Sequence, residues 1–125
     1  MSIRRQSQTL LASAARTAAI TSAEFSAEEA ICSVFVFDCT VDPASASITP
    51  SIEGKDPESG NLYTILAAAA VSSVSTVELK VGKDITAAAN VAANTMLPEI
   101  FRVSVAVADA DSITYSFSVT HMVDN

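Results

Sequence analysis

The residues that could carry chemistry in this 125-residue chain are first of all its single histidine and its two cysteines. His121 could act as a general base only with a serine or cysteine nucleophile and an orienting acid beside it. Its position near the end of a predicted strand instead favours a partly exposed structural residue. Cys32 and Cys39 belong to no Cys-x-x-Cys motif, and no His-x-x-x-His spacing accompanies them. These residues therefore indicate neither a zinc site nor a redox centre.

Acidic residues are the other candidates for a site. Asp109 and Asp111 could offer oxygen atoms to Ca²⁺, but an EF-hand loop needs about five or six ligands at defined positions. Two aspartates at a reversal of the chain are more simply explained as turn formers. Glu24, Glu28 and Glu29 could imitate the paired acids of a glycosidase, yet no aromatic platform for a sugar ring accompanies them. The three glycines are scattered and form no phosphate-binding loop, so the residues predict a protein that is not an enzyme and holds no cofactor or metal.

Composition excludes two classes of partner. Fourteen acidic and seven basic residues give a net charge of −7, which disfavours nucleic acid, because phosphate contacts need clustered lysine and arginine. The one basic cluster is Arg4-Arg5. No apolar stretch approaches the ~20 residues of a membrane span. Leu10-Leu11 is far shorter than the roughly 7–15 apolar residues of a signal peptide. We therefore expect synthesis in a cytoplasm, which two reduced cysteines suit.

The clearest structural pattern is alternation with period two over residues 100–123. Apolar residues alternate with serine, threonine and alanine on both sides of an aspartate-rich segment, residues 109–112. This pattern predicts a half-buried antiparallel hairpin with one apolar face and one face of small hydroxyl side chains. Such an uncharged polar face suits close approach by another chain.

A second strand is predicted over residues 30–40, which are almost continuously apolar and rich in valine and phenylalanine. This composition is typical of a central strand, with Phe35 and Phe37 on one face. Cys32 and Cys39 are an odd number of residues apart, so they lie on opposite faces, about 23 Å apart, and cannot form a disulfide with each other.

The middle of the chain predicts a further hairpin. Residues 47–55 form a strand with Ile48 and Ile52 on one face, and Pro50 within it favours an edge strand or a bulged one. Residues 56–61 form a turn, and residues 62–68 form the return strand. Residues 76–82 alternate again, whereas residues 83–98 predict a long irregular crossover with one helical turn at most.

These elements predict an all-β fold: a β-sandwich or a jelly-roll-like small barrel of six to seven antiparallel strands. Residues 22–125 form the sandwich domain. Residues 1–21 form an extended N-terminal arm, because their alanines, serines and threonines bury little area alone. We expect a partner chain to hold this arm. The expected partner-binding residues are Arg4, Arg5, Leu10, Leu11, Arg16 and Ile20.

Three blocks of sequence resemble a known family. They are residues 9–18 (TLLASAARTA), residues 52–64 with the segment IEGKDPESG and a following Tyr-Thr, and residues 97–115 with Leu-Pro, FRVSVA and ADADSITY. In this order they resemble small structural proteins encoded in the virion modules of tailed bacteriophages. The likeness covers most of the chain.

The resemblance implies a capsid decoration, or cement, protein of β-sandwich fold with no catalytic residues. It implies the major capsid protein as partner, a homo-oligomer with a trimer favoured, and a place on the capsid surface of the virion. One alternative is a tail, neck or fibre-associated virion protein. A second is a carbohydrate-binding β-sandwich, for which the chain, lacking tryptophan, offers few aromatic residues.

Overall fold

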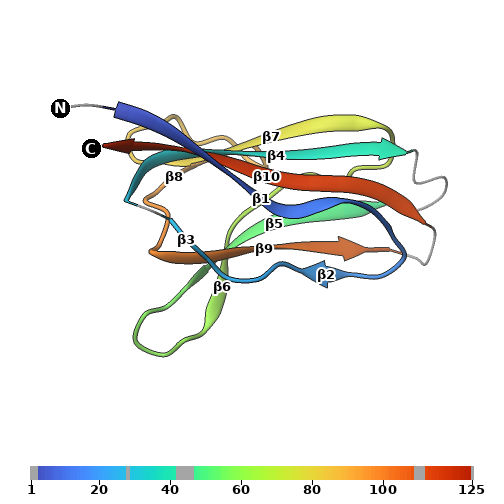
Figure 1. The fold of residues 1–125 in the computed structure, drawn as a ribbon, viewed down its shortest axis with the longest axis horizontal. Coiled ribbons are helices and arrows are strands. Elements are labelled where there is room, and N and C mark those ends of the chain that lie inside the picture. The colour runs from blue at the N-terminus through green and yellow to red at the C-terminus, as the bar shows by residue number, and fades with distance from the viewer. Residues whose placement is uncertain (1–2, 28, 42–46, 109–111, 125) are drawn as a thin grey trace.

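The fold is a β-sandwich of two five-stranded sheets, seen edge-on in Figure 1. The computed structural model describes residues 3–27, 29–41, 47–108 and 112–124, and these contain ten strands and no helix. The first sheet has the order β1 (Ile3–Arg16), β10 (Ile113–Asp124), β4 (Ala30–Val41), β7 (Ser75–Gly82) and β8 (Ala92–Asn94). The second has the order β2 (Ile20–Thr21), β9 (Ile100–Val107), β5 (Ile48–Lys55) and β6 (Leu62–Ala67), with β3 (Phe25–Ser26) also paired to β9. The expected sandwich is confirmed, and the two sheets do not close into a barrel.

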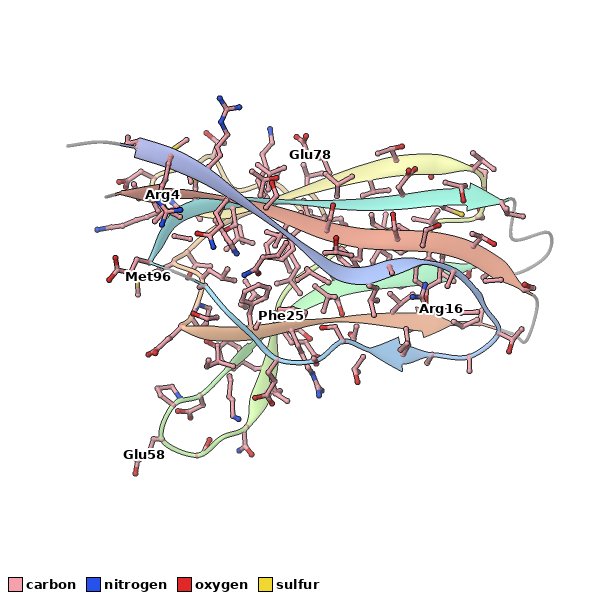
Figure 2. All side chains as sticks on the ribbon, viewed as in Figure 1. Arg4, Arg16, Phe25, Glu58, Glu78 and Met96 are labelled. Carbon is pink, nitrogen blue, oxygen red and sulfur yellow. The ribbon has the colours of Figure 1, made fainter. Side chains whose placement is uncertain are left out.

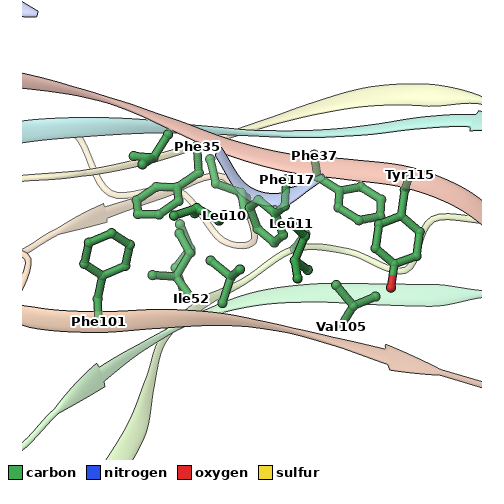
Figure 3. Packing of buried hydrophobic residues seen from close by; sticks show 14 of the residues in the cluster. Leu10, Leu11, Phe35, Phe37, Ile52, Phe101, Val105, Tyr115 and Phe117 are labelled. Carbon is green, nitrogen blue, oxygen red and sulfur yellow. The ribbon is translucent and has the colours of Figure 1, made fainter. Parts of the chain in front are cut away.

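The core lies between the sheets and is filled by the apolar face that alternation predicts. Phe35 and Phe37 of β4 are fully buried, as the central-strand prediction requires. The ring of Phe35 contacts that of Phe101, on the opposite sheet, in an edge-to-face arrangement with the centroids 5.7 Å apart. Within the first sheet, the rings of Phe37 and Phe117 contact each other in the same way at 5.5 Å. Figure 3 shows these rings interleaved with Leu10, Leu11 and Ile52. Interlocked aromatic rings of this kind fix the spacing of the two layers.

The expected hairpin over residues 100–123 is wrong in its pairing, although its alternation is right. β9 pairs with β5, β2 and β3 in one sheet, whereas β10 pairs with β1 and β4 in the other. The chain therefore crosses from one layer to the other between them. Alternation reports which side chains face the core and contains no information on which strand lies alongside. Residues 109–111 of the expected turn lie outside the described residues.

β5 is not an edge strand, because it lies between β9 and β6. The structure shows how Pro50 is accommodated there. The amide of Ala68 donates a hydrogen bond to the Pro50 carbonyl at 2.9 Å, so the side of Pro50 that lacks an N–H faces the end of β6, which stops at Ala67. The pairing of β5 with β6 also has an irregularity between Ile52 and Glu53.

The predicted turn at residues 56–61 joins β5 to β6. Its Gly60 has φ +78°, and the Gly60 amide donates to the Asp56 carbonyl at 2.8 Å. The crossover over residues 83–98 contains no helical turn. Asp84 and Asn90 adopt left-handed conformations that interrupt a helix, and β8 adds there as a short strand parallel to β7.

The N-terminal segment is extended, as expected, but the sandwich itself holds it. β1 pairs with β10 from Ile3 to Arg16, and its two leucines are buried in the core. Residues 3–16 are thus an edge strand of the sandwich and not a detached arm, so the boundary expected after residue 21 does not separate two bodies. A role of this segment toward partner chains stays a prediction.

Candidate interaction surface

The histidine predicted to be partly exposed is completely buried. His121 faces inward near the end of β10, with its Nδ1 2.7 Å from the Ser33 hydroxyl and its ring 5.7 Å from that of Phe101. A serine beside a histidine is the start of a catalytic dyad. Here both side chains are sealed between the sheets, with exposed fractions of 1% and 0%, so no substrate can reach them. The pair acts as a hydrogen-bonded part of the core.

The other candidate groups that the structure describes lie apart from one another. Cys32 and Cys39 lie on opposite faces of β4, as predicted, and form no disulfide with each other. Glu24 forms an ion pair with Lys55 at 2.9 Å, and Glu29 is exposed. Within the described part of the chain, no three histidine, cysteine or acidic side chains gather as metal ligands. The remaining acidic candidates, Glu28, Asp109 and Asp111, lie outside the described residues.

No helix among the described residues is long and apolar enough to cross a membrane.

The expected partner-binding residues divide into two groups. Leu10 and Leu11 are buried in the core, and Ile20 packs against it. Arg16 lies over the ring of Tyr115, with its guanidinium carbon 4.8 Å from the ring centroid. These four side chains stabilise their own fold.

Arg16 is held at both ends of its guanidinium. One nitrogen donates to the Ala12 carbonyl at 2.7 Å and another donates to the Tyr115 carbonyl at 3.0 Å. Arg4 and Arg5, by contrast, are exposed at the start of β1, where Figure 2 labels Arg4. Of this exposed pair, Arg4 donates a hydrogen bond to the Gln6 side chain at 3.2 Å.

β1 is an unusually long edge. It is the outermost strand of its sheet and runs for 14 residues, whereas edge strands of soluble proteins are usually kept short or are protected by proline or by inward-facing charge. Its register with β10 is regular from Ile3 to Thr9, and irregularities follow between Thr9 and Leu11 and between Leu11 and Ala14. The N-terminal half of β1 is therefore a regular strand with one edge facing outward.

The charge of this edge differs from that of the body. The first 23 residues contain three of the seven basic residues and none of the fourteen acidic residues, since Glu24 is the first acid in the chain. This asymmetry is visible in the sequence and could have identified the edge as a candidate surface. What the sequence did not show is that the segment is a strand of the sandwich.

A second exposed region lies at the β5–β6 hairpin. Glu58 is at its tip, away from the two sheets, as Figure 2 shows. Between the hairpin and residues 95–100 lies a groove of about 580 Å³, lined in part by Tyr63, Met96 and Pro98. Tyr63 is 49% exposed and Met96 is 70% exposed. These are large apolar side chains with little cover from their own chain.

Comparison with known proteins gives a fold and no family. No protein-family profile matches the chain, and no curated protein matches its sequence. The structure is similar to a chain of Bacillus endospore appendages, described as a novel family of disulfide-linked pili, with TM-score 0.51, 10% identity, and coverage of 98% of this chain and 89% of that one. It is also similar to a chain of infectious bursal disease virus, Gx strain, with TM-score 0.51, 13% identity, and coverage of 97% of this chain but only 32% of the viral one. At these identities the likeness shows the fold alone: a β-sandwich shared with one chain of a bacterial appendage and one chain of a virus.

Proposed function

We propose that this protein is a non-enzymatic structural subunit that decorates the outer surface of a tailed-bacteriophage capsid and stabilises the shell. The observation that carries the proposal is the long, basic, open edge strand β1 on an otherwise acidic body. An edge strand presents a row of main-chain donors and acceptors that another chain can bind. The fold likeness to chains of two large assemblies supports the structural class.

The major capsid protein is the proposed partner of the acidic body. Acidic groups on the surface suit a shell whose subunits offer exposed basic residues, because complementary charge guides docking and fixes orientation. Copies of the protein are proposed to associate, with a trimer favoured. Arg4 and Arg5 lie on the edge proposed to contact other chains, and Leu10, Leu11, Arg16 and Ile20 hold that edge in place.

The test is the binding of purified protein to empty capsid shells, with the number of bound copies counted. Deletion of residues 1–21 would be uninformative, because it also removes Leu10 and Leu11 from the core. The better variant changes an exposed acid of the body. Glu78→Lys, at an exposed position of β7 outside the β5–β6 turn, is expected to weaken binding to shells while leaving thermal unfolding unchanged.

Binding over the whole shell surface supports decoration. A few copies at a single vertex would instead favour the second candidate, a tail, neck or fibre-associated protein, for which the likeness to a pilus chain is the motivating observation. No binding to shells at any ionic strength would overturn the decoration proposal.

A further inference from the structure

Among the outermost strands of the described residues, two have edges long enough to form a ladder with another chain. The outermost strands are β1 with 14 residues and β6 with 6, whereas β8 has 3 and β2 and β3 have 2 each. A strand of two or three residues can form few intermolecular hydrogen bonds. β1 and β6 therefore offer the longest edges among the outermost strands, beside the part of β7 before Lys80 that β8 does not cover.

The two long edges lie on opposite sides of the molecule. β1 leads directly into β2, which is the outermost strand of the second sheet, so these two strands share one side of the sandwich. β6 and β8 are the outermost strands at the other ends of the two sheets and contact each other. One copy can thus offer β1 to the β6 of a second copy while its own β6 remains available to a third. Such a contact between different surfaces is heterologous, and it closes into a ring or continues as a filament.

The lengths of the two edges match. The regular part of β1, Ile3–Thr9, is followed by the first irregularity, and β6 spans Leu62–Ala67. The Ala67 carbonyl at the end of β6 accepts a hydrogen bond from the Asn90 side chain at 3.0 Å, so another copy would approach the beginning of the strand, where Tyr63 and Thr64 are exposed.

The charges of the two edges are complementary. Arg4 and Arg5 lie at the start of β1, and the turn that leads into β6 contains Asp56 and Glu58. Hydrogen bonds from the Glu58 amide and the Ser59 hydroxyl lower the pKa of Asp56, which keeps its carboxylate charged. Parallel alignment of β1 with β6 brings the two arginines beside this turn.

We infer that β1 of one copy adds to β6 of a second copy, in parallel, with Arg4 and Arg5 beside Asp56 and Glu58, so that copies associate head to tail. This inference rests on the proposed structural role and names the contact between copies. Three copies closing into a ring would produce the favoured trimer.

The first experiment measures self-association in solution by sedimentation at low and high salt, without shells. Arg4→Glu with Arg5→Glu is expected to weaken association about tenfold at low salt, because two attractive contacts become repulsive. Combining that pair with Glu58→Arg in the same chain restores part of the loss, since the charges are then exchanged. Asp38→Lys, on the outward face of the central strand, is the matched control and leaves association unchanged.

The second experiment tests the geometry with introduced cysteines. Ser7→Cys and Thr64→Cys, both at exposed positions, are prepared as separate proteins, mixed and oxidised. A disulfide between position 7 of one copy and position 64 of another, identified by mass spectrometry, supports the inference. A disulfide that joins position 7 of two copies would overturn it, because that product requires symmetric pairing of two β1 edges.

A monomer at all concentrations would also overturn the inference. Shell binding is measured separately from self-association. A monomer that still binds over the shell would leave the decoration proposal standing. A protein that self-associates but does not bind shells would refute the decoration proposal alone.

Discussion

The two halves of β1 differ in what they contact, although they form one continuous strand. The second half anchors the strand: Leu10 and Leu11 enter the core, and Arg16 packs on Tyr115. The first half pairs with β10 in a regular register, with one side-chain hydrogen bond between Ser7 and Thr120 at 3.0 Å, and Ile3, Arg4 and Arg5 are exposed. The difference teaches that one strand can be anchored in the core at one end and leave its other end exposed, where we propose docking. Substitutions in the two halves should therefore have separable effects.

The largest effect is expected in the anchoring half. Leu11→Ala removes a side chain that is only 7% exposed, so it should lower the free energy of unfolding by about 3 kcal/mol. Chemical denaturation with a linear extrapolation measures this change. A loss below about 1 kcal/mol would show that β1 is not anchored through this residue.

Arg16 should have an intermediate effect on stability. Arg16→Ala removes the stacking on Tyr115 and three hydrogen bonds to main-chain carbonyls, and we expect a loss of about 1–2 kcal/mol. Arg16→Lys provides the comparison, because lysine keeps the charge and loses the planar contact. Equal stability of wild type and Arg16→Ala would contradict the anchoring role.

Tyr115 gives a prediction that depends on pH. Its hydroxyl is buried without a hydrogen-bond partner among the described residues, and burial raises the pKa of this phenol, an effect that the charge of Arg16 partly offsets. Tyr115→Phe removes the unsatisfied group and should therefore stabilise the fold by about 1 kcal/mol at neutral pH.

The sign of the pH dependence follows from the raised pKa. The folded state holds the proton more tightly than the unfolded state, so this contribution to stability is present below pH ~10 and is lost as the pH rises further. Wild type should thus lose more stability than Tyr115→Phe between pH 9 and 11. An equal loss of unfolding free energy in the two proteins between pH 9 and 11 would contradict the prediction.

The smallest effect on stability is expected in the exposed half. Arg4→Glu with Arg5→Glu should change the free energy of unfolding by less than about 0.5 kcal/mol, because both side chains are at the surface. Thermal unfolding of this variant, measured on the same samples as its sedimentation, checks the predicted stability. If this pair lowered stability as much as Leu11→Ala does, the proposed division of β1 would fail.

The sequence predicted well the residues that face inward. Alternation placed Phe35, Phe37 and Tyr115 correctly because burial of one sheet face imposes a period of two. One feature of β1 removed that signal from the N-terminal segment. Leu10 and Leu11 are adjacent and both buried, which is possible only because the register shifts there, and an adjacent pair does not alternate.

Strand partners could not be predicted in the same way. The C-terminal residues 100–123 fit a hairpin and a crossing between sheets equally well, because both place the same side chains inward. Of the candidate surface, the exposed arginines were identified from charge. The edge they lie on depends on the pairing of β1 with β10, which no local pattern specifies.

That pairing has a consequence for how the protein folds. Arg4 lies opposite Val123, so β1 has to wait until β10 has been synthesised before it can join the sheet. Closing so long a loop is slow, and topologies rich in such distant contacts fold on long timescales. Until residues 113–124 have emerged, Leu10 and Leu11 have no completed core to enter. The edge that we propose for docking therefore forms only on molecules that have finished folding, so incomplete chains would lack it.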